Sequence, residues 1–404
     1  MGKKHKDMAV TIVQNPDTFT PACNPIVWTF SSNQTAQPNF SFYVEFYVQG
    51  NLHSAHTVFP ESGIYGKFDA SQIMRALTTT PVADSAFVQD FGTAMLTCYV
   101  DVYERYGTTP TLQANAAATI RRAFNGSFKY RQFINWNSDN YDVKELDGAL
   151  FTTYFPRSEK AWCRYDEYFF LGLFGKRFVL GDVWTMFIEL YDSGGNLINN
   201  DAYNIGYERY WELNVGPEVI VANTSIIQAN FDQCAYYQIY VRFSDGVTTN
   251  YTEVFTIWYD QECTTYNPVR LHWLNKFGVY DSFSFDLVSQ TNGNVTANNY
   301  QRQLGQWGNS GAYSFLNNAP QMQHYSKRSI EQMIINSDWI KEAVQHWLVE
   351  ELYESPRVYI EQGSQFVPVM VTNPNYVKKL RRKDGLIQEL VQLDKTYEYI
   401  SQLN

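Results

Sequence analysis

Apolar residues alternate with polar or aromatic ones along several short segments of this chain, beginning with FSFYVEFYV. The apolar residues at every second position from Phe40 to Val48 would share one face, and Tyr43, Glu45 and Tyr47 would lie on the other. A period of two is typical of a strand with one buried face, and the Gly-Asn pair that follows would make its turn.

Similar segments recur about every ten residues, with Gly, Asn, Asp and Pro between them. They predict strands at Met95–Gly107, Ala118–Trp136, Tyr168–Phe174, Trp184–Tyr191, Asn196–Asn199, Tyr236–Phe243 and Tyr251–Tyr259, and a strand, turn and strand within Val269–Leu287. A short helix is expected at Ala70–Leu77. This spacing is typical of β-sandwiches of the immunoglobulin or fibronectin type III kind.

The period changes near Ser329. Apolar residues there recur at helical spacing, so one long helix, or a helix pair broken near Asn336, is expected to end before Pro356. The residues that carry this pattern are Ile330, Met333, Ile334, Ile340, Val344, Trp347 and Leu348. Strands are expected again at Val367–Thr372, Tyr376–Lys383 and Leu386–Tyr399.

These elements predict a mainly β fold with an α+β C-terminal part, divided into three domains. The first is an N-terminal β-sandwich with an extended arm at residues 1–163. The second is a central, fibronectin type III-like sandwich at residues 164–266, and the third is an α+β domain at residues 267–404 with the long helix or helix pair.

The composition narrows the class of protein. Aromatic residues make up 17% of the 404 residues, whereas charged residues make up 18%, against about 25% in ordinary globular proteins. Intrinsic disorder requires the opposite balance. A net charge of −10 argues against a general nucleic-acid binder, and no apolar run approaches the roughly 20 residues of a membrane span. The five scattered cysteines predict buried thiols and neither a disulfide framework nor a zinc site.

Motifs for catalysis are absent from the sequence. It contains no G-x-S-x-G, no phosphate-binding loop and no dinucleotide fingerprint. Glu208 and Glu212 flank aromatic residues and are the best candidates for a glycosidase pair, while His53 and His56 are too few for a metal site. We expect no enzyme activity, no catalytic residues, no cofactor and no metal.

The aromatic surplus instead favours contact between proteins, because aromatic residues are enriched in interface cores and charged residues are depleted there. The candidate interface or packing residues are Trp28, Trp273, Phe277, Tyr280, Trp339 and Trp347. A basic run, Lys378, Lys379, Arg381 and Arg382, could contact DNA backbone or an acidic partner, and a solvated hairpin is the alternative.

Several segments together resemble, in the same order, structural proteins of tailed phages that infect Bacteroidetes, in particular crAss-like phages. They are NPIVWTFSS, FSFYVEFYV, AFNGSFKYRQF, NPVRLHWLNKFGVYDSFSFDL, NSDWIKEAVQHWLVEELYESPRVYI, VPVMVTNPNY and KDGLIQELVQLDKTYEY. They span nearly the whole chain, apart from about residues 201–233.

The resemblance implies a virion protein of the tail or neck, such as a tail barrel or tail hub, made in the host cytoplasm. It implies a homo-oligomeric ring, six-fold or twelve-fold, with other tail or neck proteins above and below and DNA passing through the lumen without sequence readout. No catalytic residues are carried over from the family, and the sequence predicts no membrane span.

Two other functions fit the same composition. Aromatic faces stack on sugars, so a carbohydrate-binding tail adhesin or receptor-binding module is the main alternative. A polysaccharide-degrading enzyme that uses Glu208 and Glu212 is the third.

Overall fold

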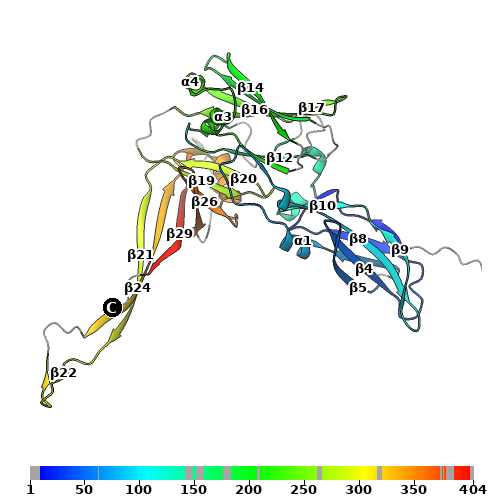
Figure 1. The fold of residues 1–404 in the computed structure, drawn as a ribbon, viewed down its shortest axis with the longest axis horizontal. Helices are drawn as coiled ribbons and strands as arrows, with labels where there is room; N and C mark the ends of the chain where they lie inside the picture. The colour runs from blue at the N-terminus through cyan, green and yellow to red at the C-terminus, as the bar shows by residue number, and fades with distance from the viewer. Residues whose placement is uncertain are drawn as a thin grey trace, which may run out of the picture. The chain divides into compact units, whose positions relative to one another are not determined.

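The computed structural model describes residues 10–61, 63–141, 149–151, 159–175, 183–206, 210–261, 266–315, 321–373, 375, 377–378 and 386–400 (Figure 1). The chain is mostly strand with a few short helices, so the predicted mainly β fold is confirmed. It forms two compact units, which are Met1–Gln261 with His272–Ser282, and Glu262–Leu271 with Phe283–Asn404.

The first part of the first unit contains two sheets, which we call module A. Its larger sheet has the order β2-β10-β8-β4-β5, and β9 also pairs with β8. These strands are β2 (Phe19–Pro21), β4 (Ser41–Val48), β5 (Asn51–Val58), β8 (Met95–Tyr106), β9 (Thr111–Ala117) and β10 (Arg121–Phe124). The smaller sheet is β1 (Thr11–Gln14), β3 (Val27–Ser31) and β6 (Tyr65–Asp69), and helix α1 (Ser71–Leu77) follows it.

The core of module A contains the apolar residues that the alternation placed on the buried face. Phe42, Val44 and Phe46 of β4 belong to one cluster of buried side chains with Trp28 and Phe30 of β3. The two sheets therefore share one hydrophobic core.

The second part of the first unit, module B, again contains two sheets. The larger one has the order β11-β18-β16-β13-β14, and β17 also pairs with β16. Its strands are β11 (Ala161–Cys163), β13 (Val183–Tyr191), β14 (Leu197–Gly206), β16 (Tyr236–Ser244), β17 (Thr249–Tyr251) and β18 (Phe255–Tyr259). The smaller sheet is β12 (Phe170–Phe174), β15 (Tyr210–Asn214) and β7 (Val88–Asp90), and helix α3 (Pro217–Asn223) follows β15.

Modules A and B have the same topology. In each, the first strand of the larger sheet pairs in parallel with the last, β2 with β10 and β11 with β18. The hairpins β4–β5 and β13–β14 correspond, as do their antiparallel neighbours β8 and β16. In each, the smaller sheet contains an antiparallel pair, β3–β6 or β12–β15, and a short helix follows it, α1 or α3. The chain thus builds one sandwich twice, although β7 joins module B from the end of module A.

Short helical turns connect these strands. They are η1 (Gly92–Ala94), α2 (Tyr130–Phe133), η2 (Ser138–Tyr141) and α4 (Gln228–Phe231). The segment predicted as a strand, or as a strand plus loop, at Ala118–Trp136 contains β10 and α2. Cys98, Cys163 and Cys234 are buried, as expected, but Cys23 is exposed, and Cys263 lies outside the described residues.

The second unit is built on a sheet with the order β20-β19-β26-β27-β29-β24-β21. These strands are β19 (Val269–Leu274), β20 (Tyr280–Phe285), β21 (Gln290–Gln301), β24 (Met322–Asn336), β26 (Val358–Gln362), β27 (Gln365–Val371) and β29 (Leu390–Ile400). The boundary between the units falls inside β19 and β20. The pairs β22 (Gln306–Trp307) with β23 (Tyr313–Ser314) and β25 (Ile340–Lys341) with β28 (Leu386–Ile387) complete the strands, and α5 (Glu342–Glu351) is the helix.

The predicted helix starting at Ser329 is wrong over its first half. Residues up to Asn336 belong to β24, which has β21 on one side and β29 on the other. Ile330 and Ile334 are β-branched, and hydrogen bonds to two distant strands outweigh their local helical spacing. The second half is confirmed as α5, whose buried side chains include Trp347.

The strand predicted at Tyr376–Lys383 is not present in the residues that can be judged. Val377 and Lys378 are in no strand, and the others lie outside the described residues. The first two predicted domains fall largely in the first unit and the third largely in the second, except that His272–Ser282 belongs to the first. The three-domain division stays a prediction.

Candidate assembly surfaces

Most of the aromatic residues singled out as interface or packing residues are buried. Trp28, Trp273, Phe277, Tyr280 and Trp347 are all at most 4% exposed. The Trp28 ring lies 6.1 Å from that of Phe46 and 6.4 Å from that of Phe68. Trp339 differs, with 55% of its surface exposed.

Only one residue of the predicted basic contact can be placed. Lys378 forms an ion pair with Glu350 of α5. Lys379, Arg381 and Arg382 lie outside the described residues.

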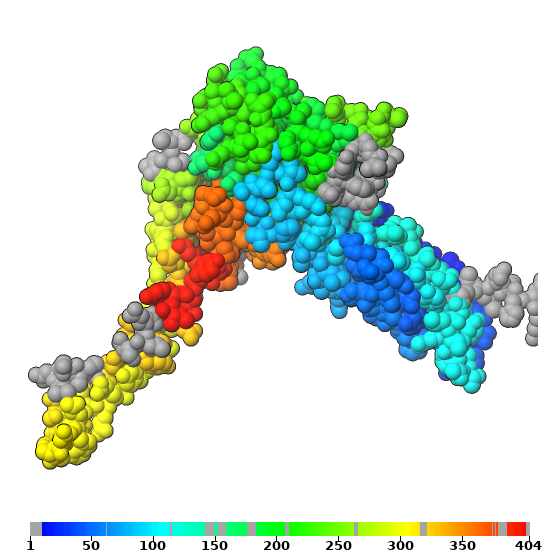
Figure 2. Space-filling model, in the orientation of Figure 1, coloured from blue at the N-terminus to red at the C-terminus, as the bar shows by residue number. Residues whose placement is uncertain are grey.

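The most exposed part of the second unit is a segment that we call the arm, residues 287–330. All twelve residues of β21 are exposed. Among the described residues, β29 pairs with β24 between Arg328 and Asn336. On the tip side of Arg328, the described parts of β21 and β24 form a two-stranded ribbon (Figure 1). Figure 2 shows this segment in yellow as a narrow projection of the second unit that ends in the β22–β23 hairpin.

Large apolar side chains line the arm without cover. Trp307 and Phe315 near the tip are 74% and 72% exposed. Val295, Tyr300, Leu304, Met322 and Tyr325 of the arm are also exposed, as are Tyr397, Tyr399 and Ile400 at the end of β29. A two-stranded ribbon is marginally stable alone, and exposed apolar patches of this kind mark protein contacts. β21 is also the last strand of its sheet, so its outer edge can accept a further strand.

The arm also differs from the rest of the chain in charge. Residues 287–330 contain Arg302, Lys327 and Arg328 and no Asp or Glu, in a chain with a net charge of −10. Arg328 lies 3.9 Å from Glu398. The sequence analysis missed this segment, although the absence of acidic residues over its length is visible in the sequence.

A second surface covers the outer face of the larger sheet in module A. Tyr43, Glu45 and Tyr47 of β4 lie directly opposite Tyr103, Asp101 and Tyr99 of β8, and we call these six residues face A. The rings of Tyr47 and Tyr99 stack at 4.7 Å with an interplanar angle of 1°.

Face A places two carboxylates opposite each other. The Tyr47 hydroxyl donates to Glu45 at 2.9 Å, and this bond raises the pKa of Tyr47 to about 12. Burial raises the pKa of Asp101, and the charge of Glu45 raises it further. Neither carboxylate has an ion pair among the described residues, and Asp101 Oδ1 is buried without a hydrogen-bond partner. Like charges directly opposite in a sheet are destabilising.

Module B repeats this arrangement at equivalent positions, which we call face B. Phe187, Glu189 and Tyr191 of β13 lie opposite Tyr240, Gln238 and Tyr236 of β16. Tyr191 and Tyr240 both donate to Glu189, at 2.6 and 2.9 Å, and the first bond raises the pKa of Tyr191 to about 12. Face B therefore has a single carboxylate, with a hydrogen bond to each oxygen, where face A has two carboxylates.

One arginine recurs as well. The guanidinium of Arg105 lies 5.8 Å from the Tyr43 ring, and that of Arg242 lies 4.9 Å from the Phe187 ring. The repeat has a sequence signal that the sequence analysis missed. FYVEFYV and MFIELYD both precede a Gly-Asn-Leu turn, and YVDVYER corresponds to YYQIYVR.

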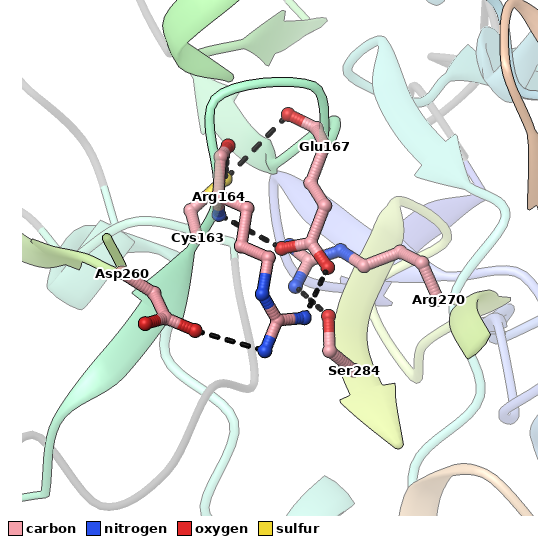
Figure 3. A network of polar contacts seen from close by, with 6 residues as sticks. All are labelled: Cys163, Arg164, Glu167, Asp260, Arg270 and Ser284. Carbon is pink, nitrogen blue, oxygen red and sulfur yellow. Dashed lines mark hydrogen bonds and ion pairs between the residues drawn. The ribbon is translucent and has the colours of Figure 1, made fainter. Parts of the chain in front are cut away.

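Polar contacts hold the ends of two strands of module B together (Figure 3). Arg164, which follows β11, lies 3.3 Å from Glu167 and 2.8 Å from Asp260, which follows β18. Cys163 Sγ donates to the Glu167 carbonyl at 3.5 Å. These contacts tie together the ends of the parallel strands. In the second unit, Arg270 donates to Ser284 at 2.8 Å.

Of the two candidate glycosidase carboxylates, Glu208 lies outside the described residues. Glu212 is 1% exposed and accepts the backbone N–H of Tyr280 at 2.7 Å, while its other oxygen has no partner. Burial raises the pKa of Glu212 well above its ordinary value, and nearby Asp281 raises it further. A buried acid of this kind is not placed to meet a polymer substrate.

We expect Glu212→Gln to stabilise the protein increasingly as pH rises. A carboxyl whose pKa is raised by folding binds its proton more tightly in the folded state, so stability is lost as pH rises above the ordinary Glu pKa of about 4.3. Gln keeps an acceptor for Tyr280 without the charge. Urea unfolding at pH 5 and pH 8 should show a gain of about 1 kcal/mol or more at pH 8 and a smaller gain at pH 5. Glu61→Gln, at an exposed site, should change neither value; an equal gain at both pH values for Glu212→Gln would contradict the assignment.

No arrangement for a metal appears among the residues described. They contain no group of three or more His, Cys, Asp or Glu side chains placed to hold an ion. His56 bonds to Ser54 at 2.8 Å and its ring lies 4.9 Å from Phe68, which accounts for its position. Among the described helices, none combines the length and the apolar character needed to cross a membrane.

Comparison with known proteins gives no family. No protein-family model and no curated protein matches the chain. Two structures of the plexin A4 extracellular region align with it at 7% identity and TM-scores of 0.18 and 0.19. The alignments cover 64% and 96% of this chain but 21% and 45% of those chains. Similarity at this level carries no argument about fold or function.

Proposed function

We propose that this protein is a structural subunit that assembles with copies of itself into a ring, in the tail or neck of a tailed phage of the crAss-like type. The observation that carries the proposal is the arm, whose strand β21 and whose Trp307 and Phe315 are exposed and have no cover within their unit. The collinear resemblance to phage structural proteins supplies the setting.

The arm has the properties of a contact between subunits. Burying one large aromatic side chain removes about 150–250 Å² from water, and a standard interface buries about 1,600 Å² in total. The exposed aromatic residues of the arm therefore supply several anchors of the kind that dominate binding energy. A projecting element that binds a different surface of the next copy makes a heterologous contact, and such contacts close into rings when the rotation permits. DNA would pass through the lumen of that ring.

The test is the assembly state of the full chain with an altered arm. Wild-type protein is expected to form rings in electron micrographs and a single large species in light scattering. The double variant Trp307→Ser/Phe315→Ser should remain smaller, because it loses two exposed anchors without touching a buried core. Tyr130→Ser, at a residue 78% exposed on α2, is the matched control and should assemble normally. Wild-type protein that stays monomeric at high concentration and with virion partners would refute the proposal.

The positions of the tyrosine and tryptophan side chains give no support to the carbohydrate-binding alternative. The tyrosines of faces A and B stack on one another, at 4.7 Å for Tyr47–Tyr99 and 5.2 Å for Tyr191–Tyr236. Lys160 Nζ lies 3.4 Å from the centre of the Trp258 ring. Ring faces occupied by other side chains are not free to stack on sugars.

A further inference from the structure

We infer that the arm of one copy docks on face A of the next copy, with Arg302 entering between Glu45 and Asp101. This inference rests on the proposed self-assembly and names the surface that receives the arm. Three observations carry it: the charge of the arm, the unpaired carboxylates of face A, and the contrast between faces A and B.

The arm brings positive charge and aromatic rings together. Arg302 directly follows β21, within two residues of the exposed Tyr300, and has no ion pair among the described residues. No acidic residue lies anywhere in residues 287–330. No acidic residue of the arm itself therefore competes with an acidic surface of another copy for Arg302.

Face A has the complementary chemistry. Glu45 and Asp101 lie opposite each other, and no cation pairs with either in the part of the chain described. Arg105 is close by, but its guanidinium donates to Ser41 and Thr57. A guanidinium placed between the two carboxylates would relieve their repulsion and make charge-assisted hydrogen bonds with both.

Face B explains why module A is the partner. Gln238 replaces Asp101 at the equivalent position, so face B has one carboxylate, Glu189, and no second carboxylate opposite it. Face B of module B thus has the same arrangement of aromatic side chains as face A but lacks the second carboxylate. Of the two faces, face A is therefore the one where a cation from another copy would relieve repulsion between carboxylates.

The experiment mixes two complementary full-length variants. The face variant, Glu45→Gln/Asp101→Gln, removes both carboxylates of face A, and the arm variant is Arg302→Asp. We expect each alone to lose self-association at least about tenfold in sedimentation, because one partner of a desolvated charge pair is removed. Mixed together, the intact arm of the face variant can bind the intact face of the arm variant, so one-to-one heterodimers should form. Gln238→Ala is the matched control in module B and should assemble as wild type does.

The outcomes separate the inference from the proposed function. If Trp307→Ser/Phe315→Ser blocks assembly but the face and arm variants assemble normally, the arm docks elsewhere and the inference fails alone. If both variants fail to assemble and their mixture gives no heterodimer, with thermal unfolding unchanged, face A does not receive the arm and the inference is again overturned. Wild-type protein that never self-associates would remove both.

Discussion

Replacing Trp28 by Ala is expected to lower the free energy of unfolding of the first unit by about 3–5 kcal/mol. Trp28 is fully buried in the core of module A, between residues of both sheets, with the rings of Phe46 and Phe68 beside it. Truncation loses the transfer energy of the ring and leaves a cavity that the surrounding strands can only partly fill. Denaturant unfolding followed by tryptophan-independent circular dichroism measures the change.

The contrast with Trp339 makes this prediction specific. Both residues were candidates for an interface, but Trp339 is 55% exposed. Trp339→Ala should change the stability of the isolated chain by no more than about 0.5 kcal/mol. A comparable loss in the two variants would show that Trp28 does not occupy the core position described.

Replacing Gly278 by Ala is expected to cost about 3 kcal/mol or more. Gly278 has a φ of +79°, which side chains rarely adopt, and a Cβ there would lie 2.2 Å from the carbonyl oxygen of Asn125. The turn is also tied by its neighbours, since Thr80 donates to the Gly278 carbonyl at 2.8 Å. The backbone can neither change conformation nor move away without breaking such contacts.

Gly246 is the matched control for this substitution. It lies in the same unit with a similar φ of +82°, but nothing lies within 4 Å of an added Cβ. Gly246→Ala should therefore lower the free energy of unfolding only by the cost of a side chain at positive φ, about 1–2 kcal/mol, in the same unfolding experiment. If the Gly278 variant were no less stable than the Gly246 variant, the close approach to Asn125 would be refuted.

The alternating segments were predicted well because their signal is local. β4, β8, β13 and β16 all lie where a period of two placed them, since a strand buried on one face records that burial in its own sequence. The segment before Asn336 was predicted wrongly as a helix, because its apolar residues have helical spacing. Its strand conformation depends on pairing with β21 and β29. The high aromatic content is visible in the sequence, but composition does not say which aromatic side chains become buried.

The sequence by itself determined that this chain is mainly β and rich in aromatic residues, with low charge, because those properties belong to each residue and its near neighbours. Only the tertiary structure decided that most of the singled-out aromatic residues lie in the interior while Trp307 and Phe315 do not. It alone also placed Glu45 opposite Asp101 and Glu189 opposite Gln238. Register between strands arises from hydrogen bonds and packing over long sequence separations, and no local pattern contains that information.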